Sequence, residues 1–181
     1  MLTRIIAGVL LVTLTPVLFI IGICICLSEP HSPILFRDKR VGKYRKIFVV
    51  YKFRTMVHGA SLKPLTEAND DRVTRIGKWL RKSHLDELPQ LVNIVRGEMV
   101  FVGPRPASLL VDARNRKKFK KYPERDQLLP GLTGLRQLYP RKQATRHFAL
   151  DLILINNVHR CRFRVWIICW TIAHVCLLKG I

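Results

Sequence analysis

The feature that most restricts the fold of this chain is an apolar run from Ile5 to Leu27 that carries no charge. A helix rises about 1.5 Å per residue, so the roughly 23 residues of this run reach roughly 34 Å, enough to cross a bilayer. Pro16 lies in the middle, where it removes one backbone hydrogen bond and favours a kink. A kinked segment either crosses the bilayer or leaves on the side that it entered, and the sequence leaves both alternatives open. We expect no cleaved signal peptide, because a single basic residue precedes the run and no small-x-small site precedes Ser28.

The rest of the chain is strongly basic, with 32 Lys and Arg against 12 Asp and Glu and a net charge of +20. Such a charge calls for an acidic partner, and the candidates are anionic lipid, nucleic acid and a phosphate-rich substrate. The positive-inside tendency predicts that the basic part lies at the cytoplasmic face of a membrane. The five cysteines form no CxxC pair, which indicates reduced thiols in a cytoplasmic protein rather than a disulfide framework.

Two short strands are predicted after the apolar run, at 34–37 and 47–54, with a basic turn around Gly42 between them. Alternation along the second strand places Lys52 and Arg54 on one face, side by side at the strand end. The alternative is that both are ordinary solvated basic residues.

From residue 58 onwards the pattern predicts a polar loop and then mainly helices. The loop covers 58–71, and an apolar stripe of Val73, Ile76, Trp79 and Leu80 follows at helical spacing. Ser83 is expected to cap a second helix, which Gly97 ends. The later predicted elements are basic helical structure at 107–129, a turn at 130–134, a helix at 147–155 and an apolar interfacial helix at 163–178. The predicted fold class is α+β, mainly helical, with a small β-hairpin.

Two adjacent carboxylates, Asp86 and Glu87, stand out in a chain that has few acids. The surrounding positive potential favours the ionised form of both at neutral pH. Aspartate can attack phosphorus as a covalent nucleophile, and Mg²⁺ prefers one or two carboxylates together with phosphate oxygens. Neighbouring helical positions point about 100° apart, so we expect one of the two to attack and the other to bind metal. The structural alternative is that the pair caps a helix and forms a salt bridge to Arg81.

Arg105 follows further along the chain, between Pro104 and Pro106. Its planar guanidinium suits a diphosphate, and the two prolines restrict the backbone on both sides. The sequence therefore predicts a site for a phosphate-bearing substrate.

These residues belong to a longer series of motifs that resembles the bacterial sugar transferases, the monotopic phosphoglycosyl transferases. The resemblance covers most of residues 4–155. The matching elements are, in order, the Pro16-broken helix, Phe36-x-x-x-x-Val41-Gly42, Tyr51-Lys52-Phe53-Arg54-Thr55-Met56, Asp71-Arg72-Val73-Thr74-Arg75-Ile76-Gly77, Leu80-Arg81-Lys82-Ser83-x-Leu85-Asp86-Glu87-Leu88-Pro89-Gln90-Leu91, Asn93, Gly97-Glu98-Met99, Val102-Gly103-Pro104-Arg105-Pro106 and Pro130-Gly131-Leu132-Thr133-Gly134. No single element would be specific, but so many in one order are.

The resemblance implies a monotopic protein of the bacterial inner membrane. Its helix would break at Pro16 and re-emerge on the cytoplasmic side. Residues 1–30 would form this membrane-inserted helix, and residues 31–181 a catalytic domain at the cytoplasmic membrane surface, with interfacial amphipathic helices.

The resemblance also implies a two-step reaction. The aspartate that matches Asp86 attacks a UDP-sugar, releases UMP and holds the sugar phosphate covalently. A polyprenyl phosphate, such as undecaprenyl phosphate, then accepts the sugar phosphate in the first membrane step of glycan assembly. Glu87 matches the expected Mg²⁺ ligand. The basic residues that match positions near the substrate phosphates are Arg81, Arg105, Lys52 and Arg54.

Two stretches depart from the family pattern. After Gly134 the family usually carries an aromatic residue and a polar stretch with asparagine, whereas this chain has 135–141, Leu-Arg-Gln-Leu-Tyr-Pro-Arg. Asp151 matches the first aspartate of the C-terminal region, but 161–164, Cys-Arg-Phe-Arg, stands where the second is expected. These departures leave the choice of sugar open. They also suggest an alternative, a catalytically degenerate homologue that acts as a membrane scaffold.

A membrane-tethered nucleic-acid binder is a further alternative, suggested by the charge and the basic run 114–121. No nucleic-acid-binding motif stands out and few aromatic residues lie among the basic ones, so we expect no nucleic-acid partner. The expected partners are a UDP-sugar, a polyprenyl phosphate and anionic membrane lipid. A homodimer is left open.

Overall fold

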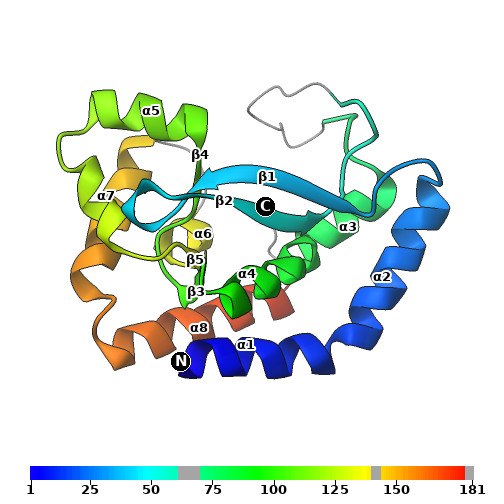
Figure 1. Cartoon of the computed structure of the whole chain (residues 1–181), viewed down its shortest axis with the longest axis horizontal. Helices are drawn as coiled ribbons and strands as arrows, with labels where there is room; N and C mark the ends of the chain where they lie inside the picture. The colour runs from blue at the N-terminus through cyan, green and yellow to red at the C-terminus, as the bar shows by residue number, and fades with distance from the viewer. Residues whose placement is uncertain (61–69, 140–143, 178–181) are drawn as a thin grey trace.

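The computed structural model describes residues 1–60, 70–139 and 144–177, in which helices surround a small sheet (Figure 1). The helices are α1 (Leu2–Thr13), α2 (Thr15–Ser28), α3 (Arg75–Lys82), α4 (Leu91–Arg96), α5 (Leu109–Lys118), α6 (Leu135–Leu138), α7 (Ala144–Asn157) and α8 (Cys161–Cys176). The strands are β1 (Leu35–Val41), β2 (Ile47–Phe53), β3 (Val100–Val102), β4 (Ala107–Ser108) and β5 (Gly131–Thr133). Short 3₁₀ helices are η1 (Lys43–Arg45), η2 (Leu85–Gln90) and η3 (Tyr122–Gln127). The predicted α+β class, rich in helix, is confirmed.

The apolar run forms two helices, as Pro16 predicts. α1 ends at Thr13, α2 begins at Thr15, and the two are bent by 59° relative to each other. Pro16 lies in the first turn of α2, where it has no N–H to donate to the turn before it. The Thr13 and Thr15 hydroxyls donate instead to carbonyls of the preceding turn, over 3.1 and 2.9 Å. The break at Pro16 is therefore confirmed.

The two helices have an apolar outer surface. Its exposed side chains include Leu2, Ile5, Val9 and Val12 of α1 and Phe19, Ile20, Ile23 and Leu27 of α2. Within the described ranges, no single helix is long and apolar enough to cross a bilayer, whereas α1 and α2 taken together reach that length and composition.

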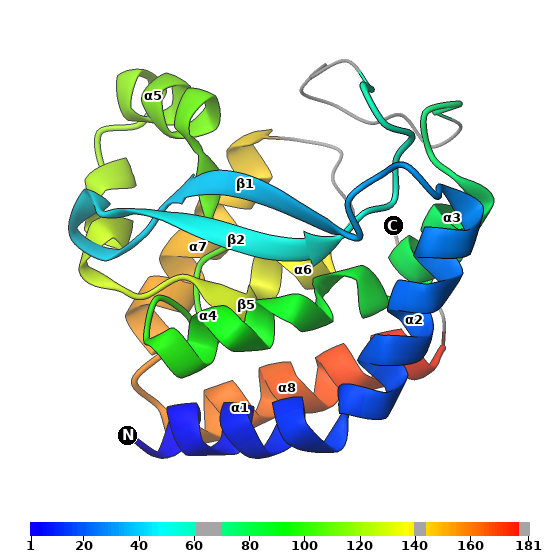
Figure 2. The same cartoon turned by 45° about the vertical axis from the view of Figure 1, so that its right-hand side comes forward.

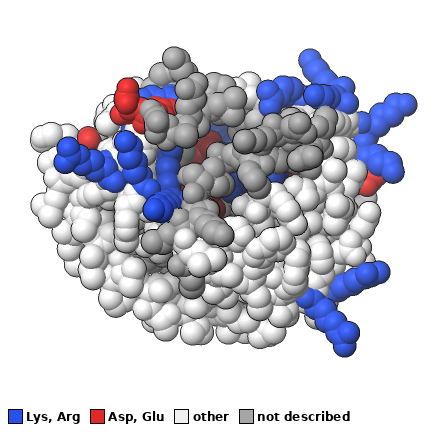
Figure 3. Space-filling view, turned by 180° about the vertical axis from the view of Figure 1, so that it is seen from behind, with Lys and Arg blue, Asp and Glu red and all other residues white. Residues whose placement is uncertain are grey.

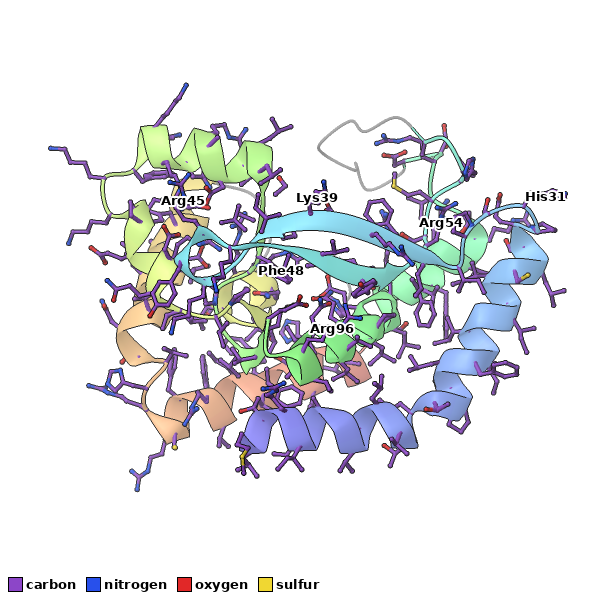
Figure 4. All side chains as sticks on the ribbon, viewed as in Figure 1. His31, Lys39, Arg45, Phe48, Arg54 and Arg96 are labelled. Atoms are coloured by element: carbon purple, nitrogen blue, oxygen red, sulfur yellow. The ribbon has the colours of Figure 1, made fainter. Side chains whose placement is uncertain are left out.

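The inner face of α1 packs on α4, with a smaller contact on β3 (Figure 2). Ala7 is fully buried there in a cluster with Phe48 and Val50 of β2, and Phe48 points from the strand towards α4 (Figure 4). Near the start of α1, Arg4 Nε donates to the carbonyl of Val95 at 2.7 Å, which satisfies an acceptor near the C-terminal end of α4. The beginning of the helix pair is thus fixed to the body of the protein.

The inner face of α2 packs on the other end of the same body. Ile21 and Ile25 are buried in a cluster with Phe53 at the end of β2 and Leu80 of α3. The two ends of the helix pair therefore contact one continuous body, at α4 and at α3.

β1 and β2 form the predicted antiparallel hairpin, with Leu35 opposite Phe53 and Val41 opposite Ile47. The connection passes through Gly42 and η1. β4 pairs with the other edge of β1, so the sheet order is β2–β1–β4.

A second sheet pairs β3 with β5 in parallel. A Cβ on Gly131 would lie 2.1 Å from the backbone nitrogen of Gly103, so only glycine allows this approach. The turn predicted at 130–134 is wrong, because its proline and glycines serve a strand with a close backbone neighbour.

The segment after α3 also differs from the prediction. Ser83 ends α3 rather than capping a new helix, and its hydroxyl donates to the carbonyls of Trp79 and Leu80 over 2.9 and 3.2 Å. η2 follows, and α4 begins only after it, ending at Gly97 as predicted. Trp79, expected on the buried stripe, is 56% exposed, whereas Leu80 is fully buried.

The C-terminal predictions hold in outline. The basic region 107–129 contains α5 and η3, and the helices predicted at 147–155 and 163–178 correspond to α7 and α8. Parts of three predictions lie outside the described residues: 61–69 of the loop, 140–141 of the departing stretch, and residue 178 at the end of the last helix. The division into residues 1–30 and 31–181 stays a prediction.

Candidate active site

α3 lies close to the end of β2 because a glycine faces the strand. The helix begins after Thr74, whose hydroxyl accepts from the Gly77 N–H at 2.9 Å. A Cβ on Gly77 would lie 2.1 Å from the carbonyl oxygen of Thr55, so no larger residue fits. At the far end of α3, Arg81 Nε donates to Thr55 Oγ1 at 2.8 Å. This contact fixes Arg81 beside the strand end.

His84 then reverses the chain. It adopts a left-handed conformation with φ 56°, a region that Asn, Asp and His enter more readily than other non-glycine residues. η2 starts at the next residue and carries Asp86 and Glu87 in its first turn. Because η2 packs on β2, the two carboxylates come close to Lys52.

Glu87 is held by two cations through one oxygen. Lys52 Nζ lies 2.5 Å and Arg105 Nη2 3.1 Å from Glu87 Oε1. Burial alone would raise the pKa of Glu87, but the charges of Lys52 and Arg105 outweigh it and hold that pKa well below its usual range. Burial has the opposite effect on the ammonium and lowers the pKa of Lys52, although Glu87 opposes the shift. The prediction that Glu87 is ionised at neutral pH agrees with this environment.

Asp86 has different surroundings. No hydrogen bond or ion pair within 4 Å holds its carboxylate in the part of the chain that the structure describes. Burial, and then the charge of Glu87, raise the pKa of Asp86 to about 6, while Lys52, Arg81 and Arg105 act against the shift. The carboxylate form thus still predominates at pH 7, in a site where water does not fully stabilise its charge.

The alternative that the acid pair caps a helix and forms a salt bridge to Arg81 does not agree with this geometry. Glu87 pairs with Lys52 and Arg105, and the salt bridges among the described residues include none from Arg81 to either acid. η2 also has no side-chain cap. Among the described residues, Glu87 has two charged partners and Asp86 has none, and these unlike environments favour different chemical roles for the two carboxylates.

Arg105 is presented by a loop whose backbone is fixed at each residue. The carbonyl of Pro104 accepts from the Gly131 N–H at 3.0 Å, and that of Pro106 accepts from Arg40 Nη1 at 3.1 Å. The carbonyl of Arg105 itself accepts from Arg125 Nη2 at 2.5 Å. The prolines are therefore parts of a firmly held loop, and the side chain of Arg105 extends from it to Glu87.

Arg54 lies apart from the two carboxylates. It is at the end of β2 beside the last turn of α2 (Figure 4), and it lines a small cavity with Ile25 and Glu29 of that region. One guanidinium nitrogen, Nη1, is buried without a hydrogen-bond partner among the described residues. The structure brings Lys52 to Glu87 but does not bring Arg54 there, and a phosphate-binding role for Arg54 stays a prediction.

Asp151 is linked to the Arg105 loop through Arg125. Its carboxylate is buried on α7, with Oδ2 3.6 Å from Arg125 Nη1 and 3.9 Å from Arg136 Nη1. Burial raises the pKa of Asp151, and the two arginines oppose the shift. Sequence reasoning missed Arg125, because nothing distinguishes it within a basic segment, and missed Thr55 although it belongs to a quoted motif.

Glu87 can supply a carboxylate ligand to a Mg²⁺ site. The described residues include no cluster of three His, Cys, Asp or Glu that could hold a metal alone. Mg²⁺ does not need one, because it keeps several waters and binds through one or two carboxylates plus substrate phosphates. The Oε2 oxygen of Glu87 accepts no hydrogen bond from the described residues, so it remains open to such a cation.

Seen from behind, the molecule has a hollow in which acidic and basic side chains meet (Figure 3). Other Lys and Arg side chains gather at the edges of this face, so an anionic ligand would approach through positive potential.

Comparison with known proteins identifies the family to which this chain is similar. The model of the family described as "Bacterial sugar transferase" matches residues 1–177. The chain is 39% identical over 136 residues to the UDP-glucose:undecaprenyl-phosphate glucose-1-phosphate transferase of Escherichia coli K12, covering 74% of this chain and 29% of that protein. It is 36% identical over 140 residues to the UDP-N-acetylgalactosamine-undecaprenyl-phosphate N-acetylgalactosaminephosphotransferase of Aeromonas hydrophila, covering 74% of this chain and 32% of that protein.

Another relative has nearly the same length. The "Uncharacterized sugar transferase EpsL" of Bacillus subtilis is 33% identical over 177 residues, which is 97% of this chain and 86% of that protein. The chain thus spans less than a third of the length of the longer relatives, but most of this shorter one. Because the family model covers nearly the whole chain, the resemblance seen in the motifs is confirmed, and the chain belongs to the bacterial sugar transferase family.

Proposed function

We propose that this chain is a phosphoglycosyl transferase. It moves a sugar 1-phosphate from a UDP-sugar to a polyprenyl phosphate, such as undecaprenyl phosphate, and releases UMP. The product would begin the assembly of a glycan, such as O-antigen, capsule, exopolysaccharide or the glycan of a glycoprotein. The observation that carries this proposal is an Asp86 carboxylate that has no partner among the described residues, beside a Glu87 held by Lys52 and Arg105. Family membership and the names of the relatives support it.

The reaction has two displacements at one phosphorus. In the first, an Asp86 oxygen attacks the phosphorus that carries the sugar, and the bond from this phosphorus to the bridging oxygen breaks. UMP leaves with that electron pair, and the sugar phosphate stays on Asp86. In the second, a phosphate oxygen of the polyprenyl phosphate attacks the same phosphorus, and the Asp86 carboxylate is regenerated.

Positive charge is needed because an anionic carboxylate must approach an anionic diphosphate. The charges of Arg81 and Arg105 oppose the rise in the pKa of Asp86, and the same charges can stabilise the charge that develops at the transferring phosphate. Lys52 keeps Glu87 ionised and in place. A Mg²⁺ ion bound by Glu87 would offset the repulsion between nucleophile and phosphates.

We place the chain on the cytoplasmic face of the bacterial inner membrane, with α1 and α2 as a re-entrant pair. Support comes from the 59° bend and from the contacts of both ends of the pair with one body. α8 adds exposed apolar side chains, Val165, Trp166 and Ile172, that suit a membrane interface. The net charge of +20 would attract anionic lipid.

The test is release of UMP by the detergent-solubilised protein with Mg²⁺, undecaprenyl phosphate and a panel of UDP-sugars. Asp86→Asn should reduce release to background, because an amide is a poor nucleophile. Asp126→Asn is the matched control, since it makes the same change at a carboxylate that bonds Arg116 and, within the described ranges, forms no hydrogen bond or ion pair with the acid pair. A mass increase equal to one sugar phosphate on a peptide that contains Asp86 would identify the covalent step.

Two results would contradict the proposal. One is UMP release that persists in Asp86→Asn. The other is no release with any donor under conditions that support an active relative, which would favour the membrane-scaffold alternative.

A further inference from the structure

A buried arginine connects α7 to the loop that presents Arg105. Arg125 of η3 is 7% exposed, and its Nη2 donates to the carbonyl oxygen of Arg105 at 2.5 Å. The contact is to the backbone, so it leaves the Arg105 guanidinium available. That guanidinium reaches the site, where Nη2 lies 3.1 Å from Glu87 Oε1.

Arg125 is itself fixed on two other sides. Its Nη1 donates to Tyr122 Oη at 2.7 Å, and its guanidinium lies 4.9 Å from the centre of the Tyr122 ring. The same nitrogen is 3.6 Å from Asp151 Oδ2, and Asp151 is 2% exposed. A charge pair with so little solvent around it has few alternative arrangements, so Arg125 holds one geometry.

The loop needs such a restraint at its centre. Pro104 and Pro106 limit φ on either side of Arg105, but the orientation of the intervening peptide depends on what its carbonyl bonds to. Arg125 supplies that partner. Without this contact, φ and ψ of Arg105 could change, which would move its side chain relative to Glu87 while the two prolines kept their own φ angles.

We propose that Arg125, held by Asp151 and Tyr122, is a positioning residue for Arg105. This role rests on the proposed transferase function, because it assigns to Arg125 the alignment of a phosphate-facing arginine. It also gives Asp151 a task at the site that requires no contact with substrate.

The chain offers a matched control in Arg116 of α5. Arg116 also bonds two partners, Asp112 at 2.7 Å and Asp126 at 2.8 Å, and also lies near the Tyr122 ring, at 5.6 Å. It donates no hydrogen bond to the Arg105 loop among the described residues. If the effect is purely structural, substitution of either arginine should therefore produce it. If the effect is one of positioning, only substitution of Arg125 should produce it.

The first measurement is hydrogen exchange of the peptide that contains 103–108, in Arg125→Lys, Arg116→Lys and the unmodified protein. We expect faster exchange of this peptide in Arg125→Lys and no change in Arg116→Lys. Arg125 reaches the Arg105 carbonyl and Asp151 through two separate nitrogens, and lysine replaces them with a single ammonium. Tyr122→Phe, a gentler change that removes one restraint on Arg125, should give a smaller effect of the same sign. Equal exchange in Arg125→Lys and the unmodified protein, or equal increases in Arg125→Lys and Arg116→Lys, would overturn the proposal.

The second measurement is UMP release in a double-mutant cycle with Arg105→Gln. Misplacement by about 1 Å can lower a rate by up to about 100-fold, so Arg125→Lys alone should lower kcat within that range and leave the KM for the UDP-sugar nearly unchanged. In the Arg105→Gln background, Arg125→Lys should lower kcat by less than about twofold, because the guanidinium that Arg125 positions is already absent. The same loss in both backgrounds would contradict positioning. If the unmodified protein released no UMP, the transferase function would fail, and the exchange experiment would still decide the role of Arg125.

Discussion

At the scale of single residues, the main feature of the site is that two neighbouring acids have different electrostatic environments. Both are largely buried, yet Glu87 accepts from Lys52 and Arg105 through one oxygen, while Asp86 has no such partner among the described residues. A carboxylate that two cations hold is a poor nucleophile, because the positive charges stabilise its ionised form and lower its basicity. A desolvated, unpaired carboxylate keeps its reactivity, which is why we assign the attack to Asp86 and not to Glu87.

Lys52 should therefore matter for both stability and rate. Lys52→Gln removes one of the two charges on a largely buried Glu87, and we expect a loss of about 3 kcal/mol in the free energy of unfolding. We also expect a roughly 10- to 100-fold fall in kcat, because Glu87 would shift towards Arg105 and change the charge around Asp86. Thermal melting and UMP release measure the two effects. Lys46→Gln, in the exposed turn of the hairpin, should change neither, and an unaltered rate in Lys52→Gln would contradict this role.

At the scale of elements, the sequence predicted the helices and strands whose apolar residues recur at a regular spacing. It missed the elements that depend on contacts with residues distant in sequence. The hairpin, the break at Pro16, and the helices α3, α7 and α8 follow from alternation, proline chemistry and apolar spacing. β5 could not be predicted, because a Pro-Gly stretch normally signals a turn, and only the approach of Gly103 explains the glycine at 131. Ser83 failed as a cap for a related reason: its hydroxyl is taken by the carbonyls of α3, and His84 makes the turn.

The same limit applies to the site. The acid pair and Arg105 were predictable because residue type and motif order point to them. The partner that Glu87 finds in Lys52 lies on a strand far away in sequence. Alternation pairs Lys52 with Arg54, but it cannot tell that Lys52 contacts Glu87 while Arg54 lines a cavity with Ile25 and Glu29. The local sequence does not distinguish Arg125 from its basic neighbours, because its role depends on its contact with the Arg105 carbonyl.

Gly77 offers a test of how an element positions a site residue. Gly77→Ala would put a Cβ 2.1 Å from the Thr55 carbonyl, so α3 must move away from β2, and we expect a loss of about 1–3 kcal/mol in stability. Because Arg81 bonds Thr55 from the same helix, UMP release should fall as well. Gly8→Ala is the matched change in another helix, where a Cβ would meet nothing within 4 Å, and it should be neutral or stabilise by about 0.5–1 kcal/mol. Similar melting temperatures for the two variants would contradict the close contact.

At the scale of the whole molecule, the question is which side of a membrane each end of the helix pair occupies. Arg4 bonds α4, and Ile25 is buried against β2 and α3, so both ends belong to the same body. If that body carries the active site at the cytoplasmic face, the N-terminus lies on that face too. A pair that crossed the membrane would have to give up the contacts of one end.

Cysteine labelling tests this topology. In a variant whose five native cysteines are replaced by serine, Thr3→Cys should react with a membrane-impermeant maleimide in inverted vesicles and not in intact spheroplasts. His31→Cys, in the exposed segment after α2 (Figure 4), is the control that should react from the cytoplasmic side in every background. Adding Pro16→Ala restores a backbone donor at the bend, so we expect a straighter helix, long enough to span, and labelling of residue 3 from outside. Labelling of residue 3 from outside while Pro16 is present would rule out the re-entrant arrangement, and the contact between Arg4 and α4 would then have to be absent from the membrane-bound protein.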